Sequence, residues 1–214
     1  MAHIEKVLIW SGWLRLSHAA VGGATLALLA TGWLIAQAPT LAQEAADYHY
    51  LAAGVLVFGL GLRVFLMFWG GRVERLDQLM PDDKEWGAVA ETARFYLGMG
   101  KAPLPRWYAH NPLWKPLYLL LYLLLLVLVL SGWLRADHSL ILGIYLPDVH
   151  AIFAAAVGWW TLLHLIAVVL HDYRGGTTDV SAMINGYRHF SIERDAHAGA
   201  PKVETAVRIK DIGS

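Results

Sequence analysis

Four long stretches with almost no charged side chains constrain this chain more than any other feature. Residues 19–38, 117–134 and 151–170 contain no Asp, Glu, Lys or Arg, and residues 51–71 contain only Arg63. About 20 apolar residues in a helix cross the hydrocarbon core of a bilayer, and a helix satisfies its backbone polar groups internally. We therefore predict an all-α membrane protein, a bundle of four transmembrane helices with spans at about 14–38, 49–71, 114–135 and 150–171.

Composition agrees with a membrane protein and excludes several chemistries. Hydrophobic residues make up 57% of the chain and charged residues only 16%, whereas a soluble domain has about a quarter of its residues charged. Cysteine is absent. The chain therefore forms no disulfide, no thiolate-held iron–sulfur cluster, no thiol nucleophile and no covalently attached c-type haem. No nucleic-acid partner is expected.

Lys and Arg predict the orientation of the bundle. They are concentrated before the first span, between the second and third spans and after the fourth. The segment that connects the first and second spans has none, and the segment that connects the third and fourth has only Arg135. Positive flanks favour the cytoplasm, so both termini and the long middle loop are expected there. Residues 83–98 of that loop have the pattern of an amphipathic helix. The expected organisation is one membrane domain, 1–192, and a polar cytoplasmic tail, 193–214.

Histidines recur within the spans at two depths. His150 and His164 are 14 residues apart on the fourth span, which leaves them within about 40° of each other around the helix and about 21 Å apart along it. His18 matches the cytoplasmic level of His164, and His49 matches the periplasmic level of His150. Ionisable residues inside a span are functional candidates by default.

The matched depths predict two bis-histidine pairs, His18 with His164 and His49 with His150. Neutral imidazoles that face each other across a helical bundle can hold a haem iron from both sides. The alternative is that each histidine hydrogen-bonds to a neighbouring helix or extends to an interface. Four imidazoles at matched depths favour the haem hypothesis.

Three motifs resemble one bacterial family. Arg15-Leu-Ser-His18 resembles the opening motif of the b-type cytochrome subunits of nickel–iron hydrogenases, thiosulfate reductases and formate dehydrogenases, within the bacterial cytochrome b561-like group. His110-Asn111-Pro112 resembles its His-Asn-Pro motif, and Met183–Arg188 resembles its segment after the fourth span. The resemblance covers roughly residues 10–188.

This resemblance implies two haem b groups, one near each membrane face, with His18, His49, His150 and His164 as axial ligands of the iron. It also implies a quinone site near His18 and His164, with His110 and Asn111 beside it. Asn111 has an alternative role, since Asn and Pro also cap and start helices. Arg15 and Arg63 are candidate partners of haem propionates, or else they extend to the cytoplasmic interface.

The predicted function is electron transfer between a partner oxidoreductase and the quinone pool. The partner is hydrogenase-like, another respiratory dehydrogenase or reductase, or a cytochrome, and it is expected on the periplasmic side. A stand-alone superoxide:quinone oxidoreductase is the main alternative, although four acidic residues against Arg135 in the periplasmic connections disfavour an anion funnel. A metal-ion transporter and a cofactor-free anchor explain the histidines less well.

Overall fold

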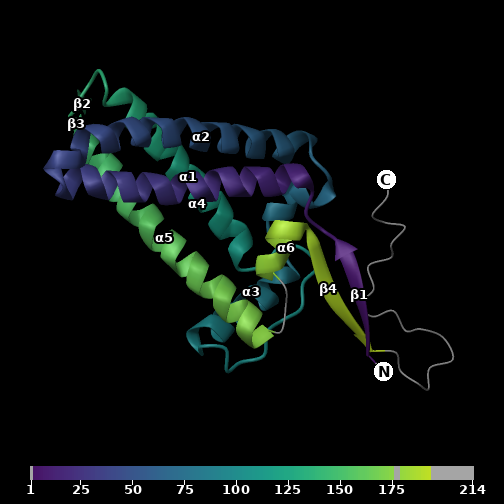
Figure 1. Ribbon diagram of the computed structural model, residues 1–214. Helices are drawn as coiled ribbons and strands as arrows, with labels where there is room; N and C mark the ends of the chain where they lie inside the picture. The colour runs from purple at the N-terminus through teal and green to yellow at the C-terminus, as the bar shows by residue number, and fades with distance from the viewer. Residues whose placement is uncertain (1, 176–178, 194–214) are drawn as a thin grey trace.

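Four long helices form most of the chain in the computed structural model, which describes residues 2–175 and 179–193 (Figure 1). They are α1 (Gly12–Gln37), α2 (Ala42–Trp69), α4 (Trp114–Leu134) and α5 (Leu146–Gly175). Each is long and apolar enough to cross a membrane. The predicted four-helix membrane bundle is therefore confirmed.

All four helices begin before the uncharged stretches from which they were predicted, and α2 begins earliest relative to its stretch. After the 3₁₀ turn η1 (Pro39–Leu41), α2 begins at Ala42, although Glu44 and Asp47 lie in its first two turns. Ala, Gln and Glu favour helices, and an acidic residue near a helix N-terminus is stabilised by the helix dipole. Helix formation there continues past the apolar run. The polar tail predicted for 193–214 lies, apart from Glu193, outside the described residues.

The bundle is built from two helical hairpins. Helix α1 packs along α2, and α4 packs along α5. The hairpins meet in a buried apolar cluster to which all four helices contribute, and which we call the central layer: Ala24, Leu56, Leu121, Leu125 and Val157.

Short elements connect the hairpins. Between α2 and α4 lie the 3₁₀ turns η2 (Arg72–Glu74) and η3 (Leu76–Leu79) and the helix α3 (Glu85–Leu97), close to the amphipathic helix predicted at 83–98. Helix α3 buries Thr92 and Phe95 and exposes Trp86. Between α4 and α5, strands β2 (Leu140–Ile141) and β3 (Ile144–Tyr145) form a small hairpin.

The two ends of the described chain pair with each other, which the sequence did not lead us to predict. Strand β1 (Ala2–Leu8) runs antiparallel to β4 (Tyr187–Glu193), from the pair Ala2 and Glu193 to the pair Leu8 and Tyr187. Helix α6 (Asp179–Asn185) precedes β4. We call β1, α6 and β4 the clasp. Since it joins the start of the first span to the end of the last, it closes the bundle at one end.

The motif Met183–Arg188 forms the turn of the clasp. Gly186 has φ +88°, a left-handed conformation that favours glycine, and its carbonyl accepts hydrogen bonds from the backbone N–H groups of Ile9 (2.9 Å) and Trp10 (3.1 Å). Arg188 is buried, and it donates to the carbonyls of Trp107 (3.2 Å) and Tyr108 (2.6 Å). The motif therefore ties three distant segments together.

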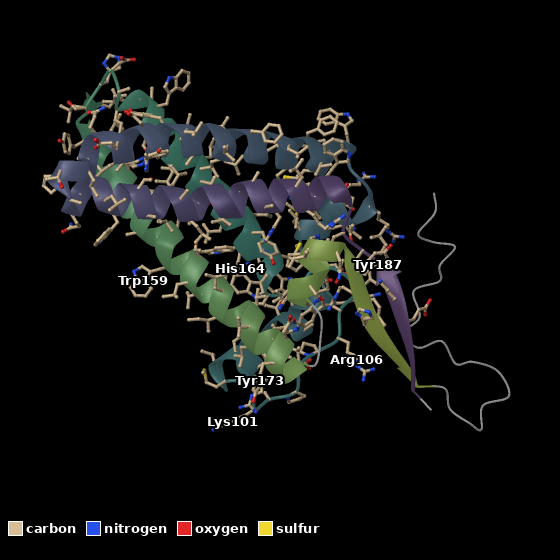
Figure 2. All side chains as sticks on the ribbon, viewed as in Figure 1. Lys101, Arg106, Trp159, His164, Tyr173 and Tyr187 are labelled. Carbon is tan, nitrogen blue, oxygen red and sulfur yellow. The ribbon has the colours of Figure 1, made fainter. Side chains whose placement is uncertain are left out.

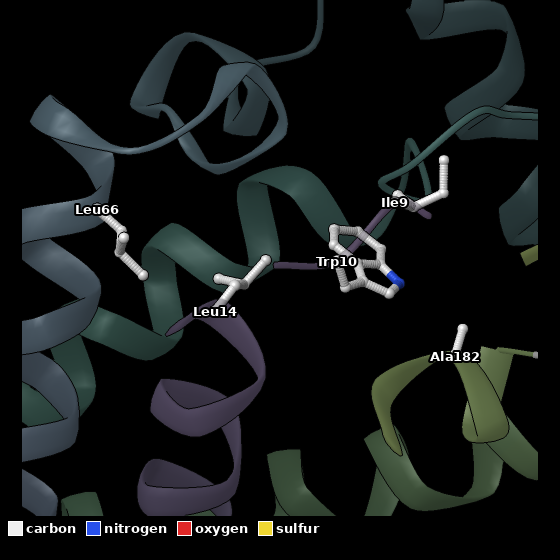
Figure 3. Close-up of a cluster of buried hydrophobic side chains, with 5 residues drawn as sticks. All are labelled: Ile9, Trp10, Leu14, Leu66 and Ala182. Atoms are coloured by element: carbon white, nitrogen blue, oxygen red, sulfur yellow. The ribbon is translucent and has the colours of Figure 1, made fainter. Parts of the chain in front are cut away.

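A second apolar cluster anchors the clasp to the bundle. Figure 3 shows its buried residues, which come from the start of α1 and the segment before it, from the end of α2 and from α6: Ile9, Trp10, Leu14, Leu66 and Ala182.

The ion pair between Lys115 and Glu85 should contribute measurably to stability. It joins α4 to α3 through two short contacts, Nζ to Oε1 at 2.6 Å and to Oε2 at 2.7 Å, and the Lys115 side chain is only 10% exposed. Glu85→Gln leaves that ammonium without its counter-charge, so we expect a loss of about 1–3 kcal/mol in the free energy of unfolding. Thermal unfolding in detergent measures it.

Asp77→Asn is the matched control. Asp77 pairs with Arg75 at 3.4 Å, but both side chains are about 60% exposed, so we expect a loss of no more than about 0.5 kcal/mol. Equal losses in the two variants would contradict a special role for the partly buried pair.

Candidate histidine site

Two histidines face each other at the end of the bundle away from the clasp. His49 lies in the second turn of α2 and His150 in the first turns of α5. Their ring centres are 6.4 Å apart and their planes are inclined by 62°. We call them the far pair. The structure thus brings together two residues that are about 100 positions apart in the chain.

The other two histidines lie near the clasp, and we call them the near pair. His18 of α1 and His164 of α5 are neighbours. His164 points from α5 toward the other helices, whereas Trp159 points away from the bundle (Figure 2). Aromatic rings enclose His164: Trp160 stacks on it with ring centres 5.0 Å apart, and Trp114 meets it edge-on at 5.2 Å.

The central layer separates the two pairs. On α5, Val157 lies seven residues after His150 and seven before His164, so all three share one face at intervals of about 10 Å. On α2, Leu56 lies seven residues after His49 in the same way. Both are among the most deeply buried side chains, at 1% and 2% exposed. An apolar, close-packed layer therefore keeps water out of the space between two polar sites.

Each pair has the donor set expected of haem ligands rather than of a bare metal site. Within the described residues, no group of three or more His, Asp or Glu side chains could hold an ion. Structural metal ions take about four protein ligands, whereas a haem iron needs only axial ones. Metal–nitrogen bonds of about 2 Å on both sides would separate two imidazole centres by about 6 Å, which agrees with the far pair.

Two glycines leave room beside the near pair. Gly22 and Gly23 follow His18 by about one turn of α1, and a Cβ atom added to either would meet no described atom within 4 Å. Open space next to a helical ligand suits a flat macrocycle. The ring spacing of the far pair fits a haem, and the open space beside Gly22 leaves room for one on α1 after His18.

Arg63 occupies on α2 the position that His164 occupies on α5, fourteen residues after the histidine of the far pair. Helix α2 therefore carries an arginine, not a histidine, at the depth of the near pair. The Arg63 side chain is 4% exposed, and it donates to Tyr122 Oη (3.1 Å) and to the Glu74 carbonyl (2.7 Å).

Arg15 lies one turn before His18. Its Nη1 donates to the Ile184 carbonyl in the clasp, and its Nε is buried without a partner among the described residues. Both arginines predicted as propionate partners thus lie on the clasp side of the bundle, each with a hydrogen bond to the protein.

His110 and Asn111 border the near pair through aromatic rings. His110 Nε2 lies 2.7 Å from the Val73 carbonyl, and the ring of Tyr118 contacts both His110 and His164. Asn111 donates to Tyr96 Oη (3.0 Å), and its Oδ1 accepts from the N–H of Leu113 (3.0 Å) just before α4. The bond from the N–H of Leu113 agrees with the alternative role given for Asn111 from the sequence, that of starting a helix.

Sequence reasoning missed two hydroxyl groups at the far pair. Thr31 Oγ1 lies 2.9 Å from His49 Nδ1, and Ser131 Oγ lies 3.0 Å from His150 Nδ1. The available signal was a shared pattern, Thr or Ser followed by Gly-Trp-Leu, at 31–34 and 131–134. The same pattern at 11–14 has another use, because Ser11 caps α1 and donates to Glu74.

Comparison with known proteins gives one match. The family model of the prokaryotic cytochrome b561 matches residues 9–186, which include all four histidines of the two pairs, every span and the clasp turn as far as Gly186. No curated protein and no solved structure matches the chain.

His110 should make the protein less stable in mild acid. Burial lowers the pKa of His110 from 6.5 to about 4. Between these values the unfolded chain binds a proton that the folded chain does not, so stability is complete above pH 6.5 and falls as the pH drops toward 4. At pH 5 we expect a cost of about 2 kcal/mol relative to pH 7.5, which thermal unfolding at the two pH values measures.

His110→Gln, which keeps a donor toward Val73, should remove that part of the acid sensitivity. His138→Gln is the control, because His138 is exposed in the α4–α5 connection. If wild type and His110→Gln lost the same stability between pH 7.5 and 5, His110 would not be the group responsible.

Proposed function

Because this chain belongs to the prokaryotic cytochrome b561 family, whose members are membrane cytochromes that bind haem b and transfer electrons, we propose that it is a di-haem b cytochrome. It passes electrons between a partner oxidoreductase and the quinone pool. The observation that carries this proposal is the arrangement of four imidazoles as two pairs at opposite ends of the bundle, with the central layer between them.

The far pair, His49 and His150, holds one haem and the near pair, His18 and His164, holds the other. When bound, haem b supplies one-electron redox chemistry. The protein supplies two nitrogen ligands at each site and, between the two sites, the apolar central layer. At the near site, Trp160 and Trp114 fix the plane of the His164 ring by direct contact. Arg15, one turn before His18, and Arg63, on the same side of the bundle, are the cations that meet the haem propionates.

Quinone is the substrate at the near end. Support comes from the aromatic surroundings of His164, where Tyr118 connects it to His110, and from the polar amide of Asn111 at the start of α4. Apolar and aromatic walls with few polar groups are typical of sites for small apolar ligands.

The partner oxidoreductase docks at the far end. There the β2–β3 hairpin exposes large apolar side chains, with Leu142 at 96%, Leu140 at 61% and Ile144 at 55%. Contiguous exposed apolar side chains mark interaction surfaces. The partner is a hydrogenase-like or other respiratory enzyme, or a cytochrome, on the periplasmic side of the bacterial inner membrane. The Lys and Arg distribution and the pairing of both chain ends in the clasp support this orientation.

The ligand assignment is tested by counting haem. We expect two haem b per purified chain by pyridine haemochrome assay, and one after His18→Ala or His164→Ala, because a single imidazole no longer holds the iron from both sides. His49→Ala or His150→Ala should remove the other haem.

His171→Ala is the control for the same helix. His171 lies seven residues after His164 on α5, where it stacks on Trp107 with ring centres 4.9 Å apart. It should keep both haems. Retention of two full haems after loss of any one of the four ligands would sink the assignment.

The quinone site is tested with two substitutions at Asn111. Asn111→Ala removes both the amide donor and the acceptor for Leu113, whereas Asn111→Asp keeps the acceptor alone. A lost hydrogen bond to a quinone carbonyl costs about 1 kcal/mol, so we expect haem reduction by added quinol to slow roughly five- to tenfold in both variants, with unchanged absorption spectra. Full activity in Asn111→Asp would show instead that Asn111 only starts the helix.

A further inference from the structure

Each histidine of the far pair contacts a hydroxyl group on the other helix of its hairpin. Thr31 of α1 meets His49 of α2 at 2.9 Å, and Ser131 of α4 meets His150 of α5 at 3.0 Å, both through Nδ1. The two helical hairpins thus contribute the same arrangement, a histidine near the start of the second helix and a hydroxyl near the end of the first.

The hydroxyl groups act as acceptors toward the rings. Thr31 Oγ1 donates its hydrogen to the Ala27 carbonyl at 2.7 Å, and Ser131 Oγ lies 3.3 Å from the Leu128 carbonyl. A hydroxyl has one hydrogen and two lone pairs. With the hydrogen used within its own helix, each oxygen accepts from Nδ1–H. Both imidazoles are therefore held as the tautomer with a bare Nε2, which is the form that binds a metal.

Glycine lets these helices approach. Gly32 and Gly132 directly follow the two hydroxyl residues, and their missing side chains face the histidines. A Cβ atom at Gly132 would lie 3.1 Å from His150 Cε1, tighter than ordinary contact, and one at Gly32 would lie 3.6 Å from His49 Cε1. The ring, the hydroxyl and the glycine form one packed unit on each side.

The near pair is built differently. His164 Nδ1 is buried without a hydrogen-bond partner among the described residues, and aromatic contacts hold its ring instead. The far pair therefore has ligands that form hydrogen bonds through Nδ1, whereas His164 of the near pair has none among the described residues.

We propose that Thr31 and Ser131 are positioning residues that fix the tautomer of His49 and His150 and strengthen both as ligands. This rests on the proposed function, in which the far pair holds a haem. A second group that accepts a hydrogen bond from a ligating histidine raises its basicity. A more basic pair of ligands stabilises the oxidised iron, so Thr31 and Ser131 lower the midpoint potential of the far haem. No group among residues 2–175 and 179–193 makes such a contribution to His164.

The test uses the haem-loaded protein and the variants Thr31→Val, Ser131→Ala and the two combined. We expect the midpoint potential of one of the two haem components to rise and that of the other to stay unchanged in a redox titration. Retention of the far haem should fall about 10- to 100-fold in the double variant. Thr31→Val should have the larger single effect, because the Leu128 carbonyl is also within reach of His150.

Two variants separate positioning from packing. Thr31→Ser keeps the hydroxyl and should restore the wild-type potential. Thr25→Val removes another buried hydroxyl of α1, one with no hydrogen bond to either histidine among the described residues, and should change neither potential. Unchanged potentials and haem retention in the double variant would overturn the proposal while leaving the di-haem function intact.

The tautomers can be read independently by NMR of the protein with ¹⁵N-labelled histidine. We expect two histidines with Nδ1–H whose signals change in Thr31→Val and Ser131→Ala. If the wild-type protein bound no haem, the proposed function would fall and this spectrum alone would decide the role of the hydroxyls. Two Nε2–H tautomers at His49 and His150 would refute it.

Discussion

Polar side chains inside the hydrocarbon of a bilayer must find partners within the protein, and this requirement determines which helices meet. Ser17 of α1 donates to the Gly59 carbonyl of α2 at 2.9 Å, while Thr31 and Ser131 hold histidines of the neighbouring helices. Arg63 crosses from α2 to Tyr122 of α4. Lipid cannot replace any of these bonds, so each one pins two helices at a defined depth and rotation. The apolar contacts around them supply close packing, but they are non-directional and do little to fix the depth and rotation of each helix.

Helix α5 has a special place in this arrangement because it contributes a histidine to both pairs. Its partner changes along its length, from α2 at the far pair to α1 at the near pair, since Arg63 fills the corresponding position of α2. Val157 lies between its two histidines and joins the central layer. A single rigid helix therefore sets the separation of the two sites, and the hairpin of α1 and α2 supplies the opposing ligand at each end.

The features that follow from local periodicity could be predicted from the sequence. Uncharged stretches predict the spans, and a 14-residue interval places His150 and His164 on one face of α5. Features that depend on contacts between distant segments could not be predicted. Strand β1 is as short as the flanking segment that commonly precedes a span, so its sequence does not indicate a strand. Its pairing with β4 makes it one. Thr31 and Ser131 share the pattern that precedes Gly-Trp-Leu, but only the neighbouring helix shows that each of them meets a histidine. Helix α2 includes charged residues in its first turns because helix propensity extends beyond the apolar run.

The clasp also has a consequence for the order of synthesis. Strand β1 leaves the ribosome before any of the four spans, and its partner Tyr187 follows about 180 residues later. At about 5–20 residues per second, β1 waits roughly 10–40 s with both of its edges unpaired. Charged side chains on a strand discourage pairing with the wrong partner, and Glu5 and Lys6 provide them during this interval. Strand β1 pairs with β4 only after the last span has crossed the membrane and the chain has returned to the side where the first span began. Completion of the clasp therefore marks a chain whose spans have all been inserted in the correct direction.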